Sequence, residues 1–132
     1  MKITLIRNLV AIALMGFFTQ ISMAQDESAG VALAEVANIV VSLQHFPSDA
    51  DKAALAKIAA TEGLPPGLRE MATAVSNIAH AANDEDKEVM ARIQANAEAP
   101  DRAKSLAAMI ASFNHMLSDE QKATLAGLFP SD

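Results

Sequence analysis

The chain has 132 residues, no cysteine and a formal net charge of −6. Without cysteine there are no disulfides, no thiolate chemistry and no lipidated cysteine. The acidic balance disfavours nucleic acids and anionic membrane surfaces as partners, because both are bound through clusters of lysine and arginine. The length and the hydrophobic content of 52% predict one domain with its own core.

The start of the chain has the pattern of a cleaved secretory signal. Basic residues open it, an apolar run over residues 9–18 follows, and Ser22 and Ala24 put small side chains at positions −3 and −1 of a cleavage site. The apolar run is too short to cross a bilayer as a helix. We therefore expect residues 1–24 to be removed, and residues 25–132 to be periplasmic or secreted, without a stable membrane anchor.

One short segment occurs three times, 35 residues apart. It begins with a histidine and ends with a lysine in each copy, at residues 45–52, 80–87 and 115–122. A period in this range is the signature of stacked supersecondary units. The sequence therefore predicts one helical-repeat domain of three units, at about 31–65, 66–100 and 101–132.

Each unit is expected to be a helical hairpin. Apolar residues recur with the period of a helix in its first half, and Ser48, Asn83 and Ser118 stand where they can cap the second helix. The fold class is thus all-α, six helices in three hairpins, as a short α-solenoid or a compact bundle. The expected bounds are 31–46, 49–61, 66–82, 84–97, 101–117 and 119–128. The recurring apolar and alanine positions are expected to face inward: Leu55, Met90, Leu125, Ala37, Ala72, Ala107, Ala56, Ala91 and Ala126.

Two roles can be predicted for the three histidines, His45, His80 and His115: helix capping and metal binding. As residues of the last turn, they can cap the first helix of each hairpin and interact favourably with its dipole. Alternatively, a near-threefold bundle can bring them together as a three-imidazole site of the zinc or copper type. If the first helices only lie side by side, about 8–10 Å apart, a site would need one histidine with carboxylates, such as His80 with Asp84 and Asp86.

No catalytic constellation stands out. Ser42, His45 and Asp49 suggest a hydrolase triad, but Asn77 replaces the serine in the second unit, and no strand-borne nucleophile turn is predicted. We therefore expect no enzyme and no cofactor. The leading hypothesis is a non-catalytic exported helical-repeat protein that binds another protein or a peptide. The alternative is a periplasmic binder of divalent transition metals through His45, His80 and His115.

Overall fold

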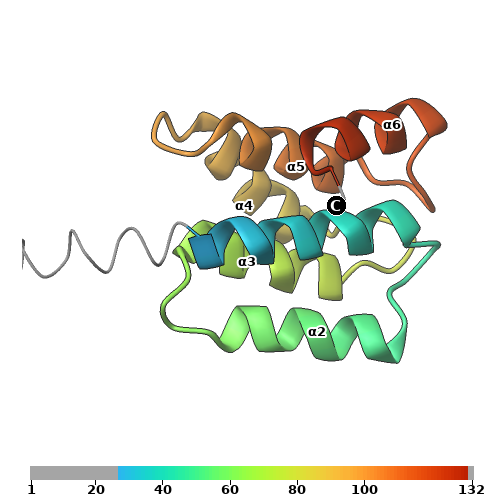
Figure 1. Ribbon diagram of the computed structural model, residues 1–132. Coiled ribbons are helices and arrows are strands. Elements are labelled where there is room, and N and C mark those ends of the chain that lie inside the picture. The colour runs from blue at the N-terminus through green and yellow to red at the C-terminus, as the bar shows by residue number, and fades with distance from the viewer. Residues whose placement is uncertain (1–26, 131–132) are drawn as a thin grey trace, which may run out of the picture.

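The computed structural model describes residues 27–130, and within them the chain is all-α, with six helices and no β-strand (Figure 1). This confirms the expected fold class. The expected signal, residues 1–24, lies outside the described residues. A first helix covers residues 27–42, and the others are α2 (Asp49–Ala60), α3 (Pro66–Ser76), α4 (Asp84–Ala95), α5 (Asp101–Ser112) and α6 (Asp119–Leu128).

The helices form three hairpins: the first helix with α2, α3 with α4, and α5 with α6. The second helix of one hairpin packs on the first helix of the next, α2 on α3 and α4 on α5, and α3 also contacts α5. The turns inside the hairpins lie at one end of the bundle, on the right of Figure 1, and the turns between hairpins lie at the other end. This places the three histidine segments at the same end.

Equivalent positions of the three units form the core. The first helices of the hairpins bury Val36, Met71 and Leu106, each at most 1% exposed. The predicted core positions of the second helices are confirmed, since Leu55, Met90 and Leu125 are also at most 1% exposed. Small residues allow the inner helices to approach closely, and the three that recur there are buried as expected: Ala37, Ala72 and Ala107.

The second set of recurring alanines does not face inward. Ala56, Ala91 and Ala126 are exposed, which contradicts the prediction. The reason is that α2, α4 and α6 touch the core along one narrow stripe. The residue after Leu55 is turned by about 100° around the helix axis, and this already points it to solvent.

The second helices begin where the sequence predicts. The side-chain oxygens of Ser48, Asn83 and Ser118 accept the backbone N–H three residues on, at 3.1, 2.7 and 3.1 Å. In the third unit the Gln121 side chain also accepts the Ser118 N–H at 3.0 Å, which completes a capping box. Each of these caps contributes about 1 kcal/mol.

The first helices of the hairpins end four to six residues earlier than predicted, at residues 42, 76 and 112 instead of 46, 82 and 117. The prediction placed the end of the first helix directly before Pro47. The helices end earlier because His45, His80 and His115 have φ angles of 65°, 69° and 67°, which an α-helix does not contain. The helix starts also differ in detail. The first helix already includes residue 27 and not only the expected residues from 31 on, whereas α5 starts at Asp101 as expected.

Within residues 27–130, no helix has the length and apolar character needed to cross a membrane.

Candidate metal centre

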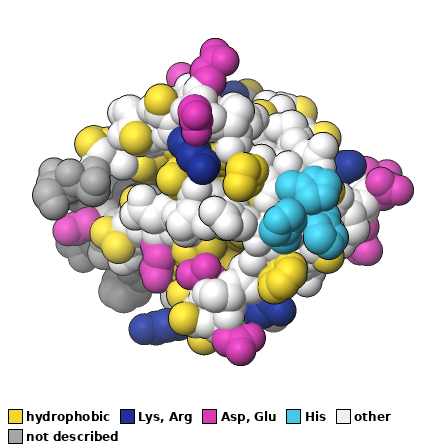
Figure 2. All heavy atoms as spheres, turned by 90° about the vertical axis from the view of Figure 1, so that its right-hand side faces the viewer, with side chains coloured by type: hydrophobic (Ala, Val, Ile, Leu, Met, Phe, Trp, Pro, Cys, Tyr) yellow, Lys and Arg dark blue, Asp and Glu magenta, His cyan; other side chains and the backbone are white. Residues whose placement is uncertain are grey.

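The three histidines that the sequence singled out lie together at one end of the bundle. All three are exposed, and Figure 2 shows their side chains as one cluster on the surface. The centroid of the His45 ring is 5.3 Å from those of His80 and His115, and the latter two centroids are 5.1 Å apart. The bundle has therefore brought residues from all three units to one point.

A closed ring of backbone hydrogen bonds holds this arrangement. The His45 N–H donates to the carbonyl oxygen of His115 at 2.6 Å, the His115 N–H donates to His80 at 2.5 Å, and the His80 N–H donates to His45 at 2.5 Å. Each histidine is thus donor to one neighbour and acceptor for the other. Because the ring joins the first unit directly to the third, the three units close on themselves at this end and do not continue as an open stack.

The histidines also share an unusual backbone conformation. Their φ angles are 65°, 69° and 67°, and they are the non-glycine residues with positive φ in the described part of the chain. At His45 and His115 the chain reverses within three residues, because the Phe46 and Met116 N–H groups donate to the carbonyls of Gln44 and Asn114, both at 2.7 Å. A residue with a Cβ atom is disfavoured in this region by about 1–2 kcal/mol.

The positions of the imidazoles correct one prediction. The sequence pattern put each histidine in the last turn of a helix, where it would cap the free carbonyls. The helices end at residues 42, 76 and 112, so each histidine follows its helix by three or more residues. Helical periodicity therefore does not account for the histidine positions. The ring of hydrogen bonds and the left-handed conformation were not foreseen, since neither leaves a periodic pattern in the sequence.

The spacing of the ring nitrogens suits one metal ion. One nitrogen of each histidine can be chosen so that all three lie within 4.8 Å of one another. Zinc–nitrogen bonds of about 2.0–2.1 Å in tetrahedral geometry need nitrogens about 3.4 Å apart. Exposed side chains can make the remaining movement of about 1.4 Å by rotating about their χ angles.

One imidazole of the cluster has a polar neighbour. Nδ1 of His115 lies 2.6 Å from Oδ1 of Asn114. In the tautomer with the proton on Nδ1, this nitrogen donates to the carboxamide oxygen and Nε2 has the lone pair that a metal needs. Metal-bound histidines commonly donate their other ring nitrogen to an oxygen in this way.

Acidic residues outnumber basic ones at the end of the bundle that carries the histidines. The second helix of each hairpin starts directly after a histidine segment, so its first turn lies at the same end of the bundle. Seven acidic residues occupy these first turns: Asp49, Asp51, Asp84, Glu85, Asp86, Asp119 and Glu120. Only three lysines stand in the same turns, Lys52, Lys87 and Lys122. Such an excess raises the local concentration of cations.

The other predicted arrangements are not brought together. Among the described residues, the group of potential ligands that forms consists of the three histidines alone. Asp86 is nearly buried, and its Oδ2 accepts from the side-chain amides of Asn83 at 2.9 Å and Asn77 at 3.3 Å. The hydroxyl of Ser42 donates to the carbonyl of Ile39 in its own helix at 3.1 Å.

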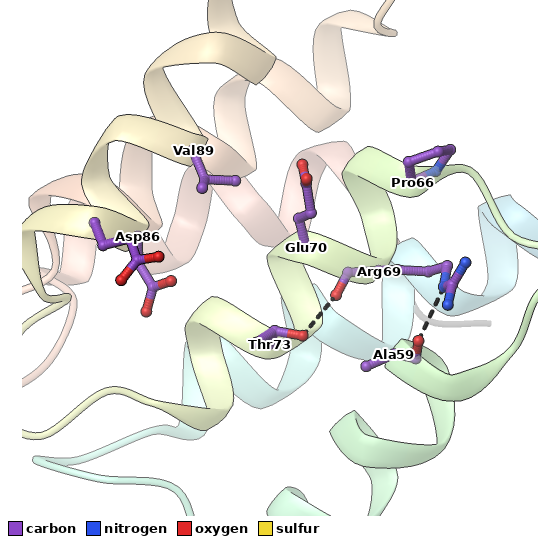
Figure 3. Close-up of a pocket in the computed structure, with 8 residues that line it drawn as sticks. Ala59, Pro66, Arg69, Glu70, Thr73, Asp86 and Val89 are labelled. Atoms are coloured by element: carbon purple, nitrogen blue, oxygen red, sulfur yellow. Dashed lines mark hydrogen bonds between the residues drawn. The ribbon is translucent and has the colours of Figure 1, made fainter.

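An open groove of about 440 Å³ lies between α3 and α4 (Figure 3), and none of the three histidines lines it. Its most prominent cation, Arg69, donates through Nε to the carbonyl oxygen of Ala59 at 2.9 Å and so ties α3 to the end of α2. Asp86, on the opposite wall, is held by the two amides described above. Because these side chains are bound within the protein, the histidine cluster is the stronger candidate site.

Comparison of the chain with protein-family models, with curated proteins and with solved structures found no match. The function is therefore argued from the site alone.

Proposed function

We propose that this protein binds one divalent transition-metal ion, zinc or copper, through His45, His80 and His115. The observation that carries the proposal is the meeting of three exposed imidazoles with their nitrogens within 4.8 Å. Neutral imidazole is a common ligand of both metals. Three such ligands, one from each unit, are within reach of one ion through rotation of their side chains.

The backbone at these residues supports a role beyond folding. Glycine adopts positive φ without the clash that a Cβ atom causes, and asparagine is also enriched there. Three exposed histidines at φ near 65–69° bury little surface, so the fold alone would favour glycine. Metal binding supplies a reason for imidazole at each of the three positions.

The pattern of the first 24 residues supports a proposal for the compartment. We propose that the protein is exported, since residues 1–24 have the features of a secretory signal. The metal would then be bound in the periplasm or outside the cell.

Binding of another protein or a peptide is the second candidate function. It is favoured by Phe46 and Met116, which are 61% and 45% exposed and directly follow two of the histidines. Exposed apolar side chains gathered on one surface mark interaction sites more often than scattered ones do.

Equilibrium dialysis and calorimetry with Zn²⁺ and Cu²⁺ test the metal proposal. We expect one ion per chain, and a loss of affinity of at least about tenfold, or about 1.4 kcal/mol, on changing any one histidine to glycine. Glycine is the informative replacement because it accepts the same φ. Gln44→Ala is the matched control, since it changes an exposed neighbour and keeps all three imidazoles. Absence of binding at neutral pH would refute the proposal, and three ions per chain would indicate a separate site in each hairpin.

A further inference from the structure

We infer that the ion held by the three histidines keeps its fourth coordination position open to solvent, and that a histidine from a basic segment of another protein takes this position. The inference rests on the proposed metal binding and adds the chemistry of the partner. Three features of the histidine end carry it: the number of ligands, the exposed apolar side chains and the charge.

The chain supplies three ligands where the metal needs four. The cluster contains no fourth histidine or carboxylate among the described residues. Zinc with three protein ligands retains a position for water or for an incoming ligand, whereas structural zinc sites have four protein ligands. Since all three histidines are exposed, the remaining position faces outward from the end of the bundle.

The surroundings of this position are suited to an aromatic ring. Three large hydrophobic side chains are exposed in residues 27–130, and two of them, Phe46 and Met116, adjoin the histidines. The third, Val31, is in the first helix, 14 residues before His45. Figure 2 shows hydrophobic side chains bordering the histidine cluster. A planar imidazole bound to the metal can pack on Phe46 and Met116, as aromatic rings do on rings and thioethers.

The charge at this end of the bundle favours a partner segment that is basic. The seven acidic residues in the first turns of α2, α4 and α6 exceed the three lysines there. A basic segment is attracted by this excess, whereas an acidic segment is repelled. A second copy of this chain would bring the same acidic end, so the charge disfavours head-to-head pairing.

Visible absorption of the Co²⁺-loaded protein tests the inference, because the spectrum of this ion reports its ligands and geometry. Three blocked tripeptides serve as probes: histidine between two lysines, histidine between two glutamates, and alanine between two lysines. We expect a saturable spectral change with both histidine peptides, a several-fold tighter binding of the lysine-flanked one at low salt, and no change with the alanine peptide. The difference between the histidine peptides should shrink as salt is added.

The outcomes separate the two proposals. Failure of the protein to bind Co²⁺, Zn²⁺ or Cu²⁺ refutes the proposed function itself. Metal binding with no spectral response to either histidine peptide overturns the open position, and equal affinities for the two peptides at low salt overturn the basic partner. Phe46→Ala should weaken the histidine peptides several-fold and leave the affinity for Co²⁺ unchanged. Unchanged peptide affinity in that variant would overturn the apolar contact.

Discussion

The left-handed backbone at the three histidines predicts an unusual order of stability between two small replacements. Changing His45, His80 or His115 to glycine or to alanine removes the imidazole and its contacts equally, so the two variants differ only in the backbone. At φ near 65–69° alanine bears a cost of about 1–2 kcal/mol. The greater chain entropy of glycine in the unfolded state offsets about 0.5–1 kcal/mol of this. Glycine is therefore expected to be more stable by about 0.5–1 kcal/mol at each position.

Urea unfolding followed by circular dichroism, with a chelator present, measures this difference. In thermal unfolding of the same variants, a change of about 1 kcal/mol would move the melting temperature of a domain of this size by about 4–8 °C. The matched control is Ala56→Gly in the exposed middle of α2, where glycine should cost about 1 kcal/mol. If the histidines stood in the last turn of helices, alanine would be the more stable replacement there too. Alanine variants more stable than glycine variants at all three positions would therefore refute the structural argument.

Four further results are expected. Leu55→Ala, Met90→Ala and Leu125→Ala should each cost about 2–5 kcal/mol in urea unfolding, because all three side chains are fully buried, and a cost below about 1 kcal/mol would contradict that burial. Ser118→Ala should cost about 1 kcal/mol through loss of the cap on α6, as the same titration shows. Metal affinity measured by competition with a chelator should fall as the pH is lowered, because each ligating nitrogen must be free of its proton, and a flat profile would exclude imidazole ligands. The intact mass of the exported protein should correspond to residues 25–132, and a mass that includes residues 1–24 would disprove cleavage.

The repeat and its helix starts could be predicted because local chemistry determines them. A serine or asparagine that caps a helix acts within three residues of itself, and Ser48, Asn83 and Ser118 are read correctly for that reason. Burial of Leu55 and its equivalents also follows from a period that the sequence displays directly.

The helix ends and the geometry of the site depend on contacts between units, which the sequence does not display. Pro47 limits how far the first helix can extend, but the turn that ends it earlier is held by hydrogen bonds that join His45 to His80 and His115. The recurrence of the histidines is visible in the sequence, and their meeting in a near-threefold bundle was one of the alternatives that the sequence left open. Their hydrogen-bonded ring joins residues 35 and 70 positions apart, so no local rule predicts it.

Closure of the repeat has a consequence for how metal binding and folding depend on each other. Because each unit contributes one histidine and the ring joins the first unit to the third, the complete ligand set exists only when all three hairpins are folded. A ligand that binds only the folded state adds about 2.7 kcal/mol of stability at a free concentration 100 times its dissociation constant. Loosening any one hairpin should therefore weaken metal binding, even when the substitution is far from the histidines. An ion at this end would cross-link the first and last units. Its removal by a chelator should therefore lower the stability of the whole domain and not of one hairpin alone.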